Sequence, residues 1–311
     1  MKISVVTTLY CSEKYIEEFY KRILNTILNI TKDYEIIFVN DGSPDNSLLN
    51  AIEFWKNDKN VKIINLSKNF GHHKAMMTGL KFATGDYIFL IDVDLEEEPE
   101  LLEIFWKNIN SNDDIDVVYG VQRDRKGKIF EKITGKLFYK VFNFFSNEQI
   151  PENIITARLM KKNYVNSLIK FQESEIFIGG LWEITGFIQI PVQVKKILRI
   201  GTTYTFRKKI ALAINAITSF SAKPLIWIFN LGVIILIFSI LVITYFLYNK
   251  LMLGVEIEGW TSLILSIWFV GGLVIFSNGI IGIYLSKIFI ETKNRPNTII
   301  KNTYGILDDG K

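Results

Sequence analysis

Two long stretches with no ionisable side chain other than tyrosine constrain the fold of this chain most strongly. They occupy residues 225–248 and 262–285. The first would form a helix of about 36 Å at 1.5 Å per residue, long enough to cross a bilayer with some tilt. Buried core helices of this length rarely lack charged residues. The sequence therefore predicts a two-helix transmembrane part behind a separate front domain.

Basic residues flank the two apolar stretches on their outer sides. The loop between them, residues 249–261, carries Lys250, Glu256 and Glu258. By the positive-inside rule, this pattern predicts a multi-pass protein of the inner (cytoplasmic) membrane, with the front domain and the C-terminal tail in the cytoplasm. The flanking basic residues are Arg207, Lys208, Lys209, Lys223, Lys287, Lys293, Arg295 and Lys301.

The composition of the 311-residue chain excludes several classes of protein. Its net charge of +4 is too mild for a nucleic-acid-binding protein, so we expect no nucleic-acid partner. The single cysteine, Cys11, excludes an internal disulfide and a cysteine-based metal site. Met1 leads directly into a strand-like segment, and we therefore expect no secretory signal peptide.

Strand and helix patterns alternate in the front part of the chain. Apolar, β-branched runs at residues 2–9, 34–39 and 61–66 are each followed by a helical pattern. The third helix is expected to be closed by Gly85. This alternation predicts an α/β domain with a parallel sheet covered on both faces, in which ligands bind at the carboxyl ends of the strands.

Two aspartates, Asp92 and Asp94, end a further apolar strand that begins at Tyr87. Alternate residues of an extended segment point to the same side, so both carboxylates can reach one cation. Oxygen ligands favour Mg²⁺ or Mn²⁺, which take one or two protein carboxylates together with phosphate and water. An isolated Asp-x-Asp is more often a polar turn. Here Asp41 and residues 69–74 follow neighbouring strands, and this context favours a metal site.

Residues 129–145 show an amphipathic basic pattern, with Lys132, Lys136 and Lys140 opposite an apolar stripe. This helix would either pack on the sheet or lie at the membrane interface with its lysines towards anionic headgroups. A second apolar helical stretch, residues 210–220, is interpreted as an interfacial segment just before the membrane. His72 and His73 are interpreted as loop residues that cap a helix.

Several short motifs spread over nearly the whole chain carry a family resemblance. They are Val39-Asn40-Asp41-Gly42-Ser43, Asn69-Phe70-Gly71, Asp92-Val93-Asp94-Leu95, Val118-Tyr119-Gly120-Val121 with Arg123 and Arg125, and a tail from Gly279-Ile280-Ile281-Gly282-Ile283-Tyr284-Leu285 to Glu291-Thr292-Lys293-Asn294-Arg295-Pro296. With these motifs the chain resembles a membrane-anchored polyprenyl-phosphate glycosyltransferase of glycosyltransferase family 2. Dolichol-phosphate mannose synthase and the bacterial undecaprenyl-phosphate glucosyltransferases are similar enzymes.

The resemblance implies a GT-A (Rossmann-like) catalytic domain that uses a UDP- or GDP-linked sugar and Mg²⁺ or Mn²⁺. It implies that Asp92 and Asp94 hold the metal against the donor diphosphate. The residues implied for the nucleotide sugar are Thr8, Tyr10, Asp41, Asn69 and Lys74. The candidates for binding the anionic phosphate of the acceptor are Arg123, Arg125, Arg158 and Arg199, because arginine suits bidentate phosphate contacts.

The implied reaction is an inverting transfer of the sugar to a polyprenyl (undecaprenyl) phosphate, which yields a lipid-linked sugar for cell-envelope glycans. The acceptor is already an anionic phosphate oxygen, so no strong general base is required. Two alternatives are a glycosyltransferase with another membrane acceptor and a non-catalytic nucleotide-binding membrane scaffold. The expected partners are the nucleotide sugar, the polyprenyl phosphate and the lipid bilayer, and a homo-oligomer is compatible with the sequence.

The chain departs from the usual family pattern at several positions. Thr8 replaces a proline, Cys11 an asparagine, Asn40 an aspartate, Glu96 a glutamine and Ile283 a glutamate. Where the family usually has Gly-Asp-Phe-Arg-Leu, the chain reads Thr156-Ala157-Arg158-Leu159 and keeps the last two residues. These departures suggest a divergent subgroup with a different sugar.

The predicted organisation has four parts. A cytoplasmic GT-A domain takes residues 1–205, and an amphipathic juxtamembrane segment takes residues 206–224. A two-helix transmembrane anchor takes residues 225–290, and a cytoplasmic tail takes residues 291–311.

Overall fold

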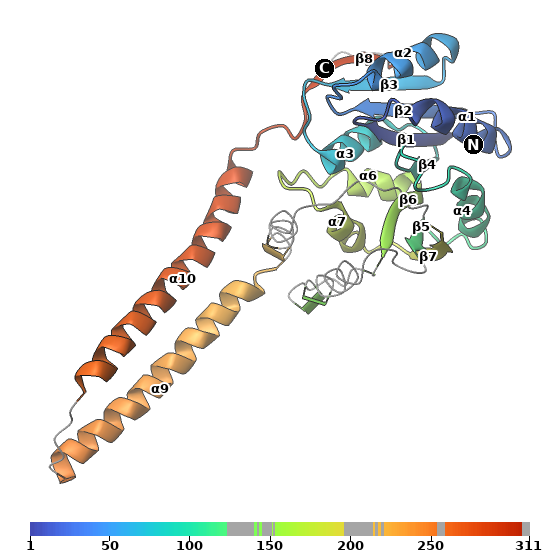
Figure 1. Ribbon diagram of the computed structural model, residues 1–311. Helices are drawn as coiled ribbons and strands as arrows, with labels where there is room; N and C mark the ends of the chain where they lie inside the picture. Colours follow the sequence, from blue (N-terminus) through green and yellow to red (C-terminus); the bar gives the residue numbers. More distant parts are fainter. Residues whose placement is uncertain are drawn as a thin grey trace. The chain divides into compact units, whose positions relative to one another are not determined.

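The computed structural model describes residues 1–122, 140–141, 143–144, 151, 153–195, 214, 217–218, 221–253 and 259–306. These residues divide into two units (Figure 1). The first unit contains the strands and the shorter helices. The second contains two long helices, α9 (Lys223–Leu253) and α10 (Trp260–Thr292).

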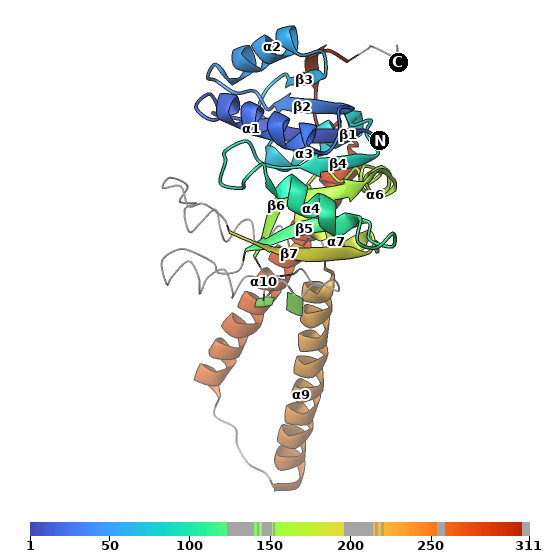
Figure 2. The ribbon, with the colours of Figure 1, turned by 90° about the vertical axis from the view of Figure 1, so that its right-hand side faces the viewer.

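The first unit is built on an eight-stranded mixed sheet. Its strands are β1 (Ile3–Leu9), β2 (Tyr34–Asn40), β3 (Val61–Leu66), β4 (Tyr87–Leu90), β5 (Val117–Gln122), β6 (Ile154–Lys161), β7 (Gln189–Val194) and β8 (Ile300–Tyr304). They lie in the order β7-β5-β6-β4-β1-β2-β3-β8 (Figure 2). The central strands β1 to β4 are parallel to their neighbours within this group.

The predicted α/β class is confirmed, but the expectation of a parallel sheet is wrong for two strands. β6 runs antiparallel to β4 and β5, and β8 runs antiparallel to β3. Strand direction depends on the end of the sheet from which the chain enters. The alternation of residues within a strand carries no information about that end.

Helices cover both faces of the sheet, as the sequence predicts (Figures 1 and 2). One face carries α1 (Ile16–Leu28), α2 (Ser47–Asn57) and α4 (Leu101–Ile109). The other carries α3 (His72–Phe82), α6 (Lys162–Leu168) and α7 (Ile178–Ile184).

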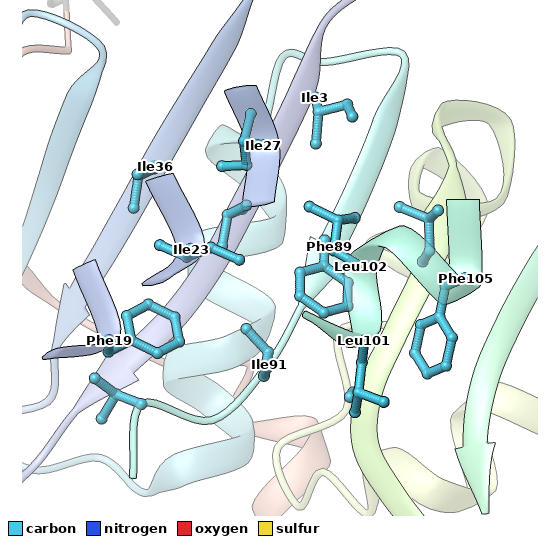
Figure 3. Packing of buried hydrophobic residues seen from close by; sticks show 14 of the residues in the cluster. Ile3, Phe19, Ile23, Ile27, Ile36, Phe89, Ile91, Leu101, Leu102 and Phe105 are labelled. Carbon is cyan, nitrogen blue, oxygen red and sulfur yellow. The ribbon is translucent and has the colours of Figure 1, made fainter. Parts of the chain in front are cut away.

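The core on the α1 side joins three central strands to two helices (Figure 3). Alternate residues of the strands, among them Ile3, Ile36 and Phe89, point towards these helices. The helices contribute Phe19, Ile23 and Ile27 from α1 and Leu101, Leu102 and Phe105 from α4. Burial of this apolar surface fixes the sheet as the rigid support of the loops at its carboxyl edge.

Gly85 does not close the third helix, contrary to the prediction from sequence. The helix α3 ends at Phe82, and Ala83 after it is extended. A Cβ at Gly85 would lie 2.7 Å from the backbone nitrogen of Ser4. A glycine is needed there because two backbone segments approach closely, and not because a helix ends.

A buried carboxylate, Glu35, ties β2 to its surroundings. It is 1% exposed, and its oxygens accept hydrogen bonds from Lys62 Nζ at 2.6 Å, Ser4 Oγ at 2.5 Å and the backbone nitrogen of Thr84 at 2.6 Å. Lys2 Nζ lies 3.0 Å away. Burial alone raises the pKa of Glu35, but the hydrogen bonds outweigh it and lower the pKa from 4.5 to about 2.

The variant Glu35→Gln should unfold more easily at neutral pH, by about 3 kcal/mol, because it removes the buried anion that the partly exposed ammonium groups of Lys62 and Lys2 contact. In the native chain this stabilisation is fully present above pH 4.5 and is lost as the pH falls towards 2, where the folded carboxylate becomes protonated. Urea unfolding between pH 7 and pH 3 measures both effects. The pH dependence of stability should be weaker in Glu35→Gln than in the exposed control Glu18→Gln. Equal pH dependence in the two variants would contradict the assignment.

The predicted tail contains a strand, β8, that no sequence pattern indicates. β8 pairs with β3, and the Asn65 side-chain amide donates to Asn302 Oδ1 at 2.8 Å. The Tyr304 ring lies 5.4 Å from the Trp55 ring. The segment before β8 is also attached, since Ser67 N donates to Ile299 O at 2.9 Å. Residues 295–306 are therefore part of the first unit.

The two long helices agree in position with the predicted spans. Within α9 and α10, Lys223–Val242 and Ser266–Thr292 are long and apolar enough to cross a membrane, as judged by length and composition. Within the second unit, Tyr284 OH donates to Ser221 O at 2.6 Å. The amphipathic pattern at residues 129–145 and the stretch at 210–220 fall almost entirely outside the described residues.

Candidate active site

The carboxyl ends of β1, β2, β3 and β4 meet at one edge of the sheet, because these strands are parallel neighbours. The loops that follow them hold most of the polar residues singled out from the sequence. In open α/β sheets this edge is where ligands bind. The candidate site is therefore built from the segments that follow residues 9, 40, 66 and 90.

Asp41 joins the loop after β2 to the loop after β3. Its Oδ1 accepts the backbone N–H of Phe70 at 2.7 Å, and its Oδ2 accepts that of Gly71 at 3.0 Å. The side chain is 2% exposed. In this structure Asp41 fixes the start of α3, and its predicted contact with the nucleoside remains a prediction.

Gly42 allows the same two loops to touch. Its φ is +61°, and a Cβ there would lie 2.4 Å from the carbonyl carbon of Lys68. Backbone atoms cannot move aside as the end of a flexible side chain can. The close approach therefore requires glycine at this position.

The variant Gly42→Ala should separate the two loops, lower the unfolding temperature and weaken the predicted nucleotide binding about 10-fold or more. Strain at positive φ alone costs about 1–2 kcal/mol. Gly186→Ala is the matched control, since Gly186 has a φ of +70° and nothing within 4 Å of its Cβ position. Thermal unfolding and UDP or GDP titrations of both variants separate the effect of the steric clash between a Cβ at residue 42 and the Lys68 backbone from the effect of positive φ. If both variants lost equal amounts of thermal stability and nucleotide affinity, the steric clash at Gly42 would have no effect.

The loop after β1 is held by side chains from the loop after β2. Cys11 N donates to Ser43 Oγ at 2.8 Å, and Glu13 N donates to Asp45 Oδ2 at 3.0 Å. Burial raises the pKa of Asp45, but hydrogen bonds from Ser43, Ser47 and the Glu13 backbone lower it to about 2. The adjacent Tyr10 side chain is 52% exposed and is available to a ligand.

His72, the first residue of α3, connects the ends of β1 and β4. Its Nδ1 lies 3.0 Å from Thr8 Oγ1, and its Nε2 lies 3.1 Å from Asp92 Oδ1. Partial burial lowers the pKa of His72, whose side chain is 47% exposed, but the hydrogen bond to Asp92 and the charges of Asp92, Asp41 and Asp94 raise it above its ordinary value. Thr8 is 7% exposed, so this structure places it beneath His72 and away from solvent.

The neighbouring His73 faces another part of the first unit. Its Nδ1 lies 3.1 Å from the carbonyl oxygen of Ile176, in the segment before α7. Burial and the nearby charge of His72 lower the pKa of His73. The two histidines thus attach the start of α3 to two separate segments.

The aspartate pair lies just beyond β4, and both residues make further contacts. Thr156 Oγ1 donates to Asp92 Oδ2 at 2.8 Å. Asp94 Oδ1 accepts the backbone N–H of Glu96 at 2.9 Å, and Leu95 between them has a φ of +61°. The pair therefore follows the strand as a tight, hydrogen-bonded turn.

The donor set fits a hard divalent cation. Asp92 and Asp94 offer carboxylate oxygens, the ligands that Mg²⁺ and Mn²⁺ prefer. No group of three or more His, Cys, Asp or Glu side chains arranged to hold a metal occurs in the part of the chain that the structure describes. An ion held here by two carboxylates would fill its other positions with phosphate and water.

Arg158, predicted to bind the acceptor, lies inside the first unit. It is 1% exposed, and its guanidinium carbon lies 2.9 Å from the centre of the Trp182 ring. Burial lowers the pKa of Arg158 to about 10. Its Nε and Nη1 have no hydrogen-bond partner among the described residues. Direct contact with a phosphate would require the side chains that cover Arg158 to move.

Of the remaining predicted site residues, two lie near the carboxyl edge of the sheet and three fall outside the described residues. Asn69 is exposed in the loop after β3, and Lys74 is half-buried in the first turns of α3. Arg123, Arg125 and Arg199 lie outside the described residues. In the structure His72 lies between Thr8 and Asp92 and contacts both. Arg158 is separated from solvent.

Three residues that contact the site were not among those predicted for it. His72 was interpreted as a capping residue, Thr156 as a departure from a motif, and Glu97 was not singled out. Glu97 is 1% exposed and accepts the backbone N–H groups of Thr156 at 3.1 Å and Ala157 at 2.8 Å. The signal for His72 was its place directly after Asn69-Phe70-Gly71, within reach of the strand ends.

Comparison with known proteins gives consistent matches. Residues 4–169 match the profile of Glycosyl transferase family 2. A protein of Mycobacterium tuberculosis (strain CDC 1551 / Oshkosh), whose description assigns it only to the glycosyltransferases, is 48% identical over 305 residues, which cover 98% of this chain and 89% of that protein. The bactoprenol glucosyl transferase of Shigella phage SfII is 32% identical over 309 residues, covering 98% of this chain and 99% of that enzyme.

Among solved structures, glucosyl-3-phosphoglycerate synthase from Mycobacterium tuberculosis in complex with UDP aligns with a TM-score of 0.49 at 15% identity. The alignment covers 70% of this chain and 78% of that one.

Proposed function

Because this chain belongs to glycosyl transferase family 2, we propose that it transfers a sugar from a nucleotide-linked donor to a polyprenyl phosphate. The observation that carries the proposal is the end-to-end match to a bactoprenol glucosyl transferase, which covers 98% of this chain. A match of that extent includes the long apolar helices as well as the sheet.

The donor would bind at the carboxyl edge of the sheet. The exposed Tyr10 would border the base, and Asn69 and Lys74 would contribute polar contacts from the loop after β3 and from α3. Thr8 and Asp41 would support this region from beneath, since both are buried. A UDP- or GDP-linked sugar fits the proposal equally.

Asp92 and Asp94 would hold Mg²⁺ or Mn²⁺ against the donor diphosphate. Such an ion supplies Lewis-acid neutralisation of the charge that develops on the departing nucleoside diphosphate. The contribution of the chain is to hold two carboxylates at a hydrogen-bonded turn directly after β4, so that little reorganisation is needed when the donor binds.

The acceptor phosphate would attack the anomeric carbon of the sugar. A bond forms between a phosphate oxygen and that carbon, and the bond from the carbon to the diphosphate oxygen breaks, so the configuration inverts. The attacking oxygen is already anionic, and the chain need not provide a general base. Arg123, Arg125 and Arg199 are the proposed cationic groups for the acceptor phosphate, and Arg158, which is 1% exposed, would join them only if the side chains that cover it moved.

The helices α9 and α10 would anchor the enzyme in the membrane that contains the lipid acceptor. The predicted placement of the front domain in the cytoplasm follows from the basic residues outside the two spans. The product would be a lipid-linked sugar used in synthesis or modification of cell-envelope glycans.

The test is to incubate the purified full chain in lipid nanodiscs with undecaprenyl phosphate, Mg²⁺ or Mn²⁺ and a panel of UDP- and GDP-linked sugars. Mass spectrometry of the lipid fraction should show undecaprenyl phosphate increased by one sugar with at least one donor. Absence of this product with every donor, under conditions where a bactoprenol glucosyl transferase is active, would refute the proposal.

A further inference from the structure

The carboxylate of Asp92 is contacted on both oxygens by side chains from distant parts of the chain. His72 Nε2 lies 3.1 Å from Oδ1, and Thr156 Oγ1 donates to Oδ2 at 2.8 Å. Oδ1 is buried, and a carboxylate oxygen with one protein contact keeps a second lone-pair site for another ligand. Two such contacts on opposite oxygens restrict rotation of the carboxylate.

Thr156 reaches Asp92 because of the way β6 pairs with its neighbours. The last pair between β4 and β6 is Leu90 with Arg158, and continuing that antiparallel register by two residues places Asp92 opposite Thr156. On its other side, β6 shifts register against β5 between Tyr119 and Val121. Such irregularities release backbone groups from the ladder and redirect side chains.

Glu97 stabilises this irregular stretch. It accepts the backbone N–H of Thr156 on Oε1 and that of Ala157 on Oε2, and it is 1% exposed. Two N–H groups that would otherwise be buried without partners are thereby satisfied. The position of the Thr156 hydroxyl therefore depends on a buried carboxylate in the same segment as the aspartate pair.

His72 is held in a similar way on the other side of Asp92. Asp41 accepts the backbone N–H of Gly71, directly before His72. Thr8 Oγ1 lies 3.0 Å from the second ring nitrogen, Nδ1. The His72 side chain is 47% exposed, so these two contacts, and not burial, orient the ring.

From these contacts we propose that His72 and Thr156 are positioning residues that orient the Asp92 carboxylate, one on each oxygen, for binding the divalent cation. The inference rests on the proposed function and assigns a role to two residues of this chain. The Thr156 hydroxyl is uncharged, so it contacts Asp92 without adding a negative charge beside it. Partners that orient metal ligands typically contribute 10- to 100-fold to metal affinity.

Two matched pairs of variants test the proposal. Thr156→Val removes the hydroxyl at nearly constant shape, whereas Thr156→Ser keeps it. His72→Gln places an amide nitrogen near the position of Nε2, whereas His72→Asn places one near Nδ1 and loses Asp92. Binding of Mn²⁺ in the presence of UDP or GDP is measured from the paramagnetic resonance signal of the free ion, using the full chain in nanodiscs.

Thr156→Val and His72→Asn should raise the dissociation constant of Mn²⁺ by about 10-fold. Thr156→Ser and His72→Gln should stay within about 3-fold of the unsubstituted chain, with unfolding temperatures equal within each pair. Sugar transfer by the two weakened variants should recover at high Mn²⁺ concentration, which a general structural defect would not allow.

Equal Mn²⁺ affinity within each pair would overturn the positioning role while leaving the proposed function intact. Absence of Mn²⁺ binding by the unsubstituted chain would overturn the positioning role and the metal site together. The expected order of affinities without any lipid-linked sugar would support the positioning role and count against the proposed acceptor.

Discussion

Replacing Asp94 with asparagine should lower the rate of sugar transfer by about 100-fold or more, since charge neutralisation by a bound metal is worth several kcal/mol in a transition state. The substitution removes one negative charge and leaves the local turn intact. Asp94 Oδ1 accepts the backbone N–H of Glu96, and an asparagine oxygen can accept the same bond. The ratio of the two rates is obtained from initial rates of lipid-linked sugar formation by the variant and the unsubstituted chain, measured at saturating donor.

The control for this prediction is Asp114→Asn, which removes the same charge from an exposed position before β5. It should transfer sugar at the rate of the unsubstituted chain. Both variants should unfold at the same temperature as the unsubstituted chain. If Asp94→Asn retained the full rate, the aspartate pair would have no role in catalysis and the proposed mechanism would be wrong.

Removal of residues 299–311 should destabilise the first unit by about 4 kcal/mol, because it deletes β8 and exposes the edge of β3. The loss includes the ladder between these strands, the Asn65–Asn302 hydrogen bond and the contact of Tyr304 with Trp55. Hydrogen bonds contribute about 1 kcal/mol each, and an aromatic pair about 1 kcal/mol. Such a change corresponds to a fall in unfolding temperature of about 10 °C.

Circular dichroism of the detergent-solubilised protein during heating measures this shift. A chain that ends at residue 306 keeps all of β8 and should unfold like the full chain. The single variant Tyr304→Ala should account for part of the loss, whereas Lys301→Ala, at an exposed position on the same strand, should not. An unchanged unfolding temperature after removal of residues 299–311 would show that β8 does not stabilise the sheet.

The aspartate pair can be recognised in the sequence because its signal is local. Asp92 and Asp94 are separated by one residue just after an apolar strand, and the strand pattern can be read within a few residues. The contacts of Asp92 were not predictable, because Thr156 lies 64 residues further along the chain. His72 follows a recognisable motif, but its distance to Asp92 depends on how α3 packs on the sheet.

Arg158 is a second case in which the sequence does not reveal the surroundings of a residue. Its position in a motif predicts contact with the acceptor, whereas the structure places it 1% exposed against Trp182 of α7. The helix α7 was not predicted, and without it the burial of Arg158 has no signal in the sequence. A residue is buried when other segments pack over it, and the segment that packs on Arg158 lies further along the chain.

Periodicity, turn residues and uninterrupted apolar length are properties of neighbouring residues, and they were sufficient to identify the α/β class, the aspartate pair and both long helices. Strand direction, the return of residues 300–304 to the edge of β3, and the convergence of His72 and Thr156 on one carboxylate are relations between segments far apart in the chain. These relations arise when the chain packs, because only packing brings such segments within hydrogen-bonding distance.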